Sequence, residues 1–145
     1  MTPHSPIVTA ARGWIGTPYR HQASRKGVGC DCLGLARGVW RELVGPEPAL
    51  PPPYSRDWGE VDHREVLVEG AAEFLIRRPY GDPRPGDLVI FRMKDRAIAK
   101  HIGILIGETR FVHALERIGV VEQALTDPWR RRIAFVFRFP ATGSS

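Results

Sequence analysis

Residues 31–43 read DCLGLARGVWREL and are a strong candidate for a helix. Leu35, Val39 and Leu43 recur at the spacing of one helix face, which predicts an amphipathic helix. Asp31 comes directly before this stripe and is a favoured N-cap residue, because its carboxylate can accept a hydrogen bond from a free N–H group of the first turn. We therefore expect a helix that begins immediately after Asp31.

Cys32 would then lie in the first turn of this helix. A thiol attacks as the thiolate, and the free N–H groups and dipole of a helix N-terminus favour that anion. Gly34 lacks a Cβ atom, so a substrate or another backbone segment can approach closely there. Cys32 is therefore a candidate nucleophile, but a free cysteine is equally common as a small buried apolar residue.

A nucleophilic cysteine needs a base, and the base needs a third group that orients it. Two of the five histidines, His101 and His113, lie in apolar runs that we predict as adjacent antiparallel strands. A two-residue loop between the strands would put them on opposite faces. A three-residue loop would make His113 oppose Gly103 and place both histidines on one face as diagonal neighbours. We therefore predict an odd-length loop or a bulge near Gly107.

The remaining sequence predicts helices first and strands second. Helices are expected over Pro6–Trp14 and Val61–Ile76, with a polar loop over His21–Gly29 and an extended proline-rich segment over Pro46–Pro53. Short β-type runs then follow over Asp87–Met93, His101–Ile106, Arg110–Ala114, Gly119–Gln123 and Ile133–Phe139. This order indicates an α+β domain in which N-terminal helices pack on an antiparallel β-sheet.

The length of 145 residues and the ordinary composition predict a single globular domain over residues 1–145. The net charge of +5 suits an anionic partner, but it is equally typical of a solvated basic surface. The N-terminus has no basic segment followed by an apolar one, and no apolar run reaches the roughly 20 residues of a membrane span. We therefore expect a protein made in the cytoplasm without a signal peptide, or exported by another route.

Several kinds of site are disfavoured. Cys30 and Cys32 are expected to stay unpaired, because side chains two positions apart diverge. A zinc site built from both cysteines and a histidine is poorly supported by their spacing, so we predict no metal and no cofactor. Nucleic-acid binding is suggested only by the charge and ranks last, because the sequence lacks a recognisable module.

At five places the sequence resembles the NlpC family of cell-wall cysteine peptidases. In chain order these are Trp14–Tyr19 (WIGTPY), Asp31–Leu35 (DCLGL, where the family usually has Asp-Cys-Ser-Gly-Leu), Pro85–Val89 (PGDLV), His101–Ile104 (HIGI) with Gly107, and Phe111–Ala114 (FVHA). The resemblance implies a compact papain-like NlpC fold of the α+β class. It also implies Cys32 as nucleophile, His101 as general base and His113 as the residue that orients the base.

The resemblance further implies a peptidoglycan substrate, cut between γ-D-glutamyl and the diamino acid of the stem peptide. The backbone N–H of Cys32 becomes a candidate donor to the oxyanion. Tyr19 and Asp31 are candidate substrate-binding residues, but we favour packing for Tyr19 and capping for Asp31. Leu33 replaces the usual serine, which is not a member of the catalytic trio.

The chain also resembles the short members encoded with tail proteins of phages and gene-transfer particles. This implies tail-tip or baseplate partners, and delivery by a virion or phage-like tail to act in the periplasm. Two alternatives remain open: a non-catalytic tail-tip component, and a thioesterase or acyltransferase of the same superfamily. Many of the latter are circularly permuted, so the order of Cys32 before His101 favours the peptidase. The run Arg130–Arg132 is expected to face solvent or a partner.

Overall fold

The computed structural model describes residues 5–51, 54 and 64–140. The helices in these ranges are α1 (Pro6–Gly13), α2 (Cys32–Leu43), α3 (Val66–Phe74) and α4 (Asp127–Arg132). The strands are β1 (Ser24–Arg25), β2 (Gly29–Cys30), β3 (Ile76–Arg78), β4 (Leu88–Phe91), β5 (His101–Leu105), β6 (Arg110–Leu115), β7 (Gly119–Ala124) and β8 (Ile133–Arg138).

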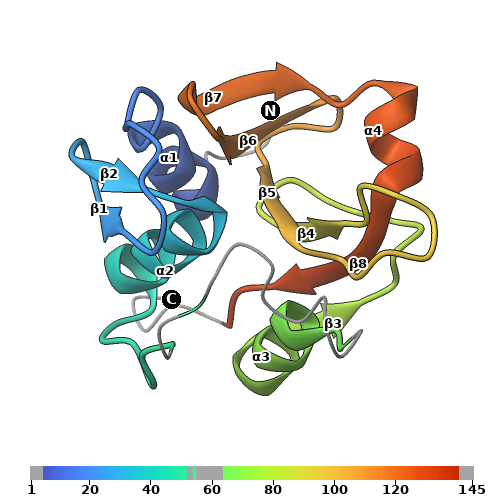
Figure 1. Ribbon diagram of the computed structural model, residues 1–145, viewed down its shortest axis with the longest axis horizontal. Helices are drawn as coiled ribbons and strands as arrows, with labels where there is room; N and C mark the ends of the chain where they lie inside the picture. The colour runs from blue at the N-terminus through green and yellow to red at the C-terminus, as the bar shows by residue number, and fades with distance from the viewer. Residues whose placement is uncertain (1–4, 52–53, 55–63, 141–145) are drawn as a thin grey trace.

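Among the described residues, six strands form one antiparallel sheet in the order β3-β8-β4-β5-β6-β7. Helices α1 and α2 contact each other and β5, and α2 also contacts β6. Figure 1 shows these two helices on one side of the molecule and the curved sheet, with α4 at its far edge, on the other. The predicted α+β architecture is confirmed.

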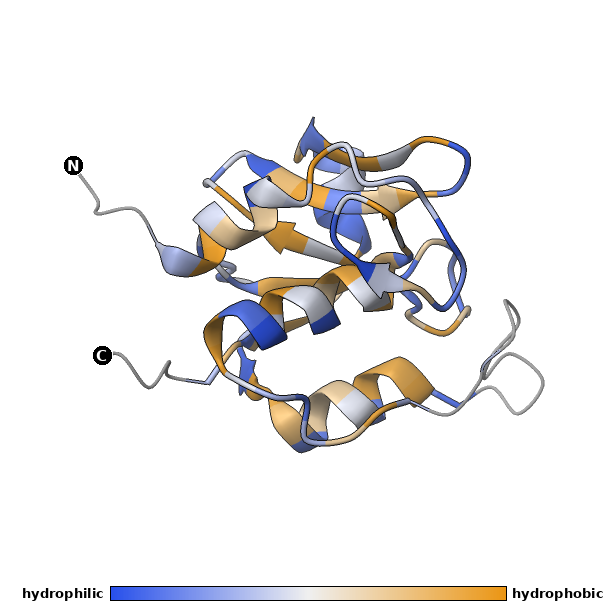
Figure 2. Cartoon of the chain, turned by 90° about the vertical axis from the view of Figure 1, so that its left-hand side faces the viewer, coloured by the Kyte–Doolittle hydropathy of each residue, from blue (hydrophilic) through white to orange (hydrophobic). Residues whose placement is uncertain are grey.

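Helix α2 begins as its sequence predicts. The carboxylate of Asp31 accepts a hydrogen bond from the N–H of Gly34 at 2.7 Å, which is the expected N-cap. Leu35 and Val39 are fully buried, and Figure 2 shows the apolar side of the helix turned inward. Trp40 lies only half-buried at the margin of this core.

At Gly34, the segment that approaches closely is the protein's own backbone at Ala23. A Cβ atom there would lie 1.8 Å from the carbonyl oxygen of Ala23, so only glycine fits. The same carbonyl accepts a hydrogen bond from the N–H of Asp31 at 3.2 Å. Gly34 thus lets the preceding loop pack directly against the first turn of α2.

The two faces of the sheet pack into two separate cores. One face contributes Ile90, Ile102 and Ile104 to the larger core, which also contains the apolar sides of α1 and α2. The other face contributes Phe91 and Phe111 to a smaller core, covered by the half-buried Trp129 of α4. The residues of β4 and β5 alternate between these cores, as the period of a strand requires.

The predicted odd-length loop near Gly107 is confirmed, and it has three residues. Ile104 pairs with Val112, and Leu105 pairs with Phe111. The N–H of Ile106 donates to the carbonyl of Arg110 at 3.1 Å, which leaves residues 107–109 as the loop. In this register His113 opposes Gly103, so His101 and His113 share a face.

The predicted helix over Val61–Ile76 begins too early and ends too late, because Arg64 and Glu65 lie before its first helical residue, Val66. Helix α3 ends at Phe74, and Leu75 is already extended, with ψ 162°. Ile76 opens strand β3 and pairs with Arg138 of β8. An apolar run such as 74–76 satisfies a helix and a strand equally well, so periodicity could not separate them. Residues 61–63 of the predicted helix lie outside the described part of the chain.

Two short elements were not predicted. The expected loop over His21–Gly29 contains half of a small ribbon, in which Ser24 pairs with Cys30 and Arg25 with Gly29. Helix α4 is only six residues long, with a proline in its first turn, and is too short to show helical periodicity. None of the helices in the described ranges is long and apolar enough to cross a membrane.

Candidate active site

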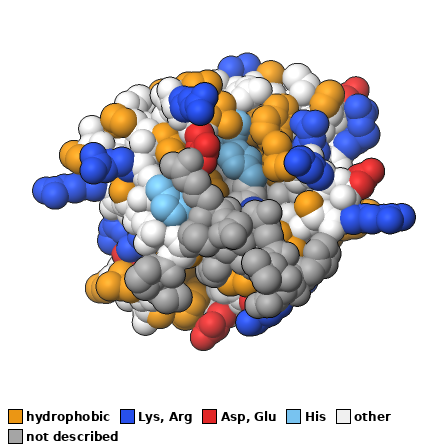
Figure 3. Space-filling view, in the orientation of Figure 1, with side chains coloured by type: hydrophobic (Ala, Val, Ile, Leu, Met, Phe, Trp, Pro, Cys, Tyr) orange, Lys and Arg blue, Asp and Glu red, His pale blue; other side chains and the backbone are white. Residues whose placement is uncertain are grey.

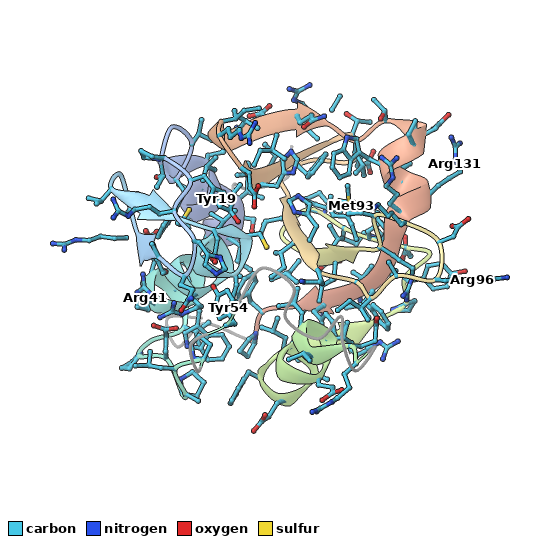
Figure 4. All side chains as sticks on the ribbon, in the orientation of Figure 1. Tyr19, Arg41, Tyr54, Met93, Arg96 and Arg131 are labelled. Carbon is cyan, nitrogen blue, oxygen red and sulfur yellow. The ribbon has the colours of Figure 1, made fainter. Side chains whose placement is uncertain are left out.

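A cleft of about 790 Å³ is lined by residues of the first turn of α2 and of the start of β5. Cys32 and His101 both line it, which brings together the predicted nucleophile and base. In Figure 4, Tyr19 and Tyr54 lie on the side of α1 and α2, and Met93 lies across from them beside the sheet. Figure 3 shows histidine atoms near the centre of this face, among hydrophobic side chains and with lysine and arginine side chains around the margin.

The thiol of Cys32 is directed from the first turn of α2 towards β5. Its sulfur donates to the carbonyl oxygen of Lys100 at 3.6 Å, and Lys100 directly precedes His101. The backbone N–H groups of Ile102 and Leu33 also donate hydrogen bonds to this sulfur. The thiol therefore lies at the junction between the helix and the strand that carries the candidate base.

Burial dominates the acid–base state of this thiol. It raises the pKa of Cys32 from 9.0 to about 11, and the nearby Asp31 carboxylate acts in the same direction. The N–H groups of Ile102, Leu33 and Cys32 lower the pKa but do not offset burial. The N–H groups at the N-terminus of α2 thus favour the thiolate, as expected, but burial outweighs them, and the thiol of the free protein is protonated at neutral pH.

His101 and His113 form the first part of a hydrogen-bonded chain. Nε2 of His101 lies 2.8 Å from Nδ1 of His113, and the two rings meet nearly edge to face, 5.0 Å apart with an interplanar angle of 76°. Nε2 of His113 lies 2.7 Å from Oε1 of Gln123 on β7. The side chains of three neighbouring strands are thereby linked in a line that ends at the cleft.

Both imidazoles are held neutral. Burial lowers the pKa of His101 from 6.5 to about 3, and the neighbouring His113 contributes in the same direction. Burial also lowers the pKa of the fully buried His113, which its hydrogen bond to Gln123 partly opposes. The indole ring of Trp129 packs against both histidines, at 5.9 Å from His101 and 5.2 Å from His113. Neutral imidazole is the form that can accept a proton from a thiol.

Asp31 has more partners than a helix cap needs. Besides the N–H of Gly34, it accepts from the N–H of Gln22 at 2.7 Å and from the hydroxyl of Tyr54. His21 lies 3.9 Å from the same carboxylate. Asp31 thus caps α2, as expected, and also holds the loop at residues 21–22 and the side chain of Tyr54 against the wall of the cleft.

Tyr19 lies beside the nucleophile segment. It forms an isolated β-bridge with Cys30 and is half-buried against the main core, which agrees with the expected packing role. It also lines the cleft that contains Cys32, so a contact with substrate stays open for this side chain. Cys30 itself is fully buried, carries a free thiol and has a pKa raised by burial to about 12.

Sequence reasoning missed three residues of the site. Tyr54 and Trp129 reach it only through tertiary packing, and no local pattern marks them. Gln123 could have been found, because the register argument used for the first hairpin also applies to β6 and β7. Phe111 pairs with Gln123 and His113 with Val121, which puts Gln123 diagonal to His113 on the same face.

The arginine run on α4 turns away from the reacting groups. Arg130 donates to the carbonyl oxygen of Glu108, and the guanidinium of Arg132 lies 5.7 Å from the Trp129 ring. Arg131 points out from the molecule in Figure 4. Within residues 5–51, 54 and 64–140, no group of three or more His, Cys, Asp or Glu side chains is placed to hold a metal ion.

Comparison with known proteins extends this result. Residues 16–138 match the sequence profile of the NlpC/P60 family. The chain is 31% identical over 129 residues to the "Murein DD-endopeptidase MepS/Murein LD-carboxypeptidase" of Escherichia coli (strain K12), covering 88% of this chain and 58% of that protein. It is 29% identical over 135 residues to the "Gamma-DL-glutamyl hydrolase" of Bacillus subtilis (strain 168), covering 92% and 29%. The chain thus spans little more than half the length of the first of these relatives.

Solved structures agree on the fold. The NlpC/p60 domain of the peptidoglycan hydrolase SagA superposes with a TM-score of 0.65 at 21% identity, covering 95% of this chain and 100% of that one. An NlpC/P60 family protein from Bacillus cereus ATCC 10987 gives a TM-score of 0.66 at 17% identity, covering 95% and 40%. At these identities the likeness shows the fold alone.

Proposed function

The chain belongs to the NlpC/P60 family, and from that premise we propose that it is a cysteine peptidase that hydrolyses peptide bonds in peptidoglycan. One observation carries the proposal: Cys32 and His101 line one cleft, and the base is already hydrogen-bonded to His113. The names of the relatives, a murein endopeptidase and a glutamyl hydrolase, support peptidoglycan as the substrate class.

The first half of the reaction is acyl transfer to the thiol. Because the pKa of Cys32 is raised to about 11, attack is coupled to loss of its proton to neutral His101. As the S–C bond forms, the carbonyl oxygen takes up the electron pair and becomes an oxyanion. The N–H of Cys32, which has no partner within the helix at this first position, can donate to that oxyanion.

The second half returns the enzyme to its starting state. The oxyanion collapses, the C–N bond breaks, and the imidazolium of His101 gives its proton to the leaving amine. A thioester to Cys32 remains. Water, losing a proton to His101, then attacks this thioester, and the acid product leaves as the thiol regains its proton. One water molecule is consumed for each bond hydrolysed.

We place the scissile bond between γ-D-glutamyl and the diamino acid of the stem peptide, as the resemblance implies and the glutamyl hydrolase relative supports. The test is a soluble stem tetrapeptide, L-Ala-γ-D-Glu-diaminopimelate-D-Ala, incubated with the protein and analysed by mass spectrometry. The expected products are L-Ala-D-Glu and diaminopimelate-D-Ala. Release of D-Ala alone, with the γ-linked bond intact, would reassign the bond.

Delivery by a phage-like tail, and the tail-tip or baseplate partners that go with it, remain part of this proposal. The check is fractionation of the producing cells and their released particles, followed by immunoblotting. The protein is expected to co-sediment with the tails, and a purely free pool would remove this part of the proposal without affecting the chemistry.

A further inference from the structure

We infer that Gln123 is a positioning residue for the reaction: its side-chain carbonyl fixes the tautomer of His113 and, through it, that of His101, so that Nδ1 of His101 is the basic atom. This inference rests on the proposed function, because it concerns the base that takes up the proton of Cys32. It assigns a role to a residue other than the predicted Cys32, His101 and His113.

The geometry starts from the register of β6 and β7. Gln123 opposes Phe111 and His113 opposes Val121, so the side chains of Gln123 and His113 project from the same face as diagonal neighbours. Oε1 of Gln123 reaches Nε2 of His113 at 2.7 Å. Gln123 is half-buried and is not among the described residues that line the cleft, so it acts on the reaction through His113.

The direction of each hydrogen bond follows from what each atom can do. A side-chain carbonyl oxygen only accepts, so His113 carries its proton on Nε2. A neutral imidazole has one donor and one acceptor, which leaves Nδ1 of His113 as an acceptor. His101 must then donate to it from Nε2, at 2.8 Å. The remaining nitrogen of His101, Nδ1, keeps its lone pair.

The same chain suits the charged state that the reaction creates. When Nδ1 of His101 takes the proton of the thiol, Nε2 still donates to His113, and His113 still donates to Gln123. No hydrogen bond has to reverse during proton transfer, so the chain is organised in advance for the imidazolium. If His113 instead carried its proton on Nδ1, His101 would accept at Nε2 and would have no basic atom left for the thiol.

Two substitutions of Gln123 distinguish the effect of its hydrogen-bond acceptor from the effect of its packing. Gln123→Met keeps the length of the side chain but removes the oxygen, and Gln123→Glu keeps an acceptor at the same place. We expect Gln123→Met to lower kcat by at least about tenfold with little change in KM, as is typical for lost partners that orient an imidazole. Gln123→Glu should stay within about fivefold of the unchanged protein. Glu122→Gln, on the same strand but the opposite face, is the matched control and should leave kcat unchanged.

The decisive readout is the tautomer itself, measured by ¹⁵N NMR of histidine-labelled protein with assignments from His101→Gln and His113→Gln. Both histidines are expected as the Nε2–H form in the unchanged protein, and Gln123→Met is expected to shift His113 towards Nδ1–H. An Nδ1–H form of His113 in the unchanged protein, or equal kcat for Gln123→Met, would overturn the inference. If the unchanged protein has the expected tautomers but cleaves no stem peptide, the proposed function fails and the role of Gln123 in setting the tautomers stands.

Discussion

At the scale of single residues, the free protein keeps its reacting groups neutral. Burial raises the pKa of Cys32 to about 11 and lowers the pKa of His101 to about 3, so a thiolate–imidazolium pair is disfavoured before substrate arrives. The dipole of α2 works in the other direction but is the weaker effect. In the proposed reaction, His101 therefore takes the proton of Cys32 as the thiol attacks.

The first prediction concerns alkylation of Cys32 by iodoacetamide. Because only the thiolate reacts and the pKa of Cys32 is about 11, the rate should rise about tenfold per pH unit from pH 7 to 9 without a plateau. Mass spectrometry of the modified protein gives the rate. A Cys32→Ser variant reports the background from the buried Cys30. A rate independent of pH between 5 and 8 would instead show a preformed ion pair.

The second prediction concerns stability in acid. The pKa of His101 is about 3 in the folded protein and about 6.5 when unfolded, so the unfolded chain binds a proton that the folded protein does not. The free energy of unfolding should therefore fall as the pH drops from about 6.5 to about 3. Urea unfolding at several pH values measures this fall, and His101→Gln should make it smaller. The same fall in both proteins would contradict the assigned pKa.

At the scale of elements, the fit of α2 against the preceding loop holds the nucleophile in place. A Cβ atom at Gly34 would overlap the carbonyl oxygen of Ala23, and this carbonyl cannot move without disturbing its bond to Asp31. The cap, the thiol and the glycine are thus parts of one arrangement at the N-terminus of the helix.

The third prediction follows from that fit. Gly34→Ala should lower the free energy of unfolding by about 2 kcal/mol or more, as overpacking against backbone does. Gly70→Ala in α3 is the matched control, because nothing lies within 4 Å of the added atom. It should raise the stability by up to about 1 kcal/mol through helix propensity. Equal effects of the two changes, measured by urea unfolding, would refute the packing argument.

Elements differ in how far the sequence predicts them. The β5–β6 register followed from the alternation of side chains and the need for His101 and His113 to meet, and the observed pairing of Ile104 with Val112 agrees with it. Strand β3 was missed because the apolar run at the end of α3 fits either structure, and pairing with β8 decides between them. Helix α4 was missed because six residues carry no period.

At the scale of the whole molecule, the sheet separates two kinds of packing. One face forms the main core with α1 and α2, and the other places His113, which is hydrogen-bonded to Gln123, against Trp129 of α4. Motifs predicted the trio because each member lies in its own local pattern. Trp129 and Tyr54 reach the cleft from distant segments, so only the folded chain identifies them.

We propose that Cys32 is the nucleophile of a peptidoglycan peptidase. Digestion of purified diaminopimelate-type peptidoglycan by the unchanged protein and by Cys32→Ala, with soluble products identified by mass spectrometry, tests this proposal. We expect new stem-peptide fragments from the unchanged protein and none from Cys32→Ala. Equal release of fragments by both proteins, or no release by either while Cys32 also resists alkylation at high pH, would contradict it.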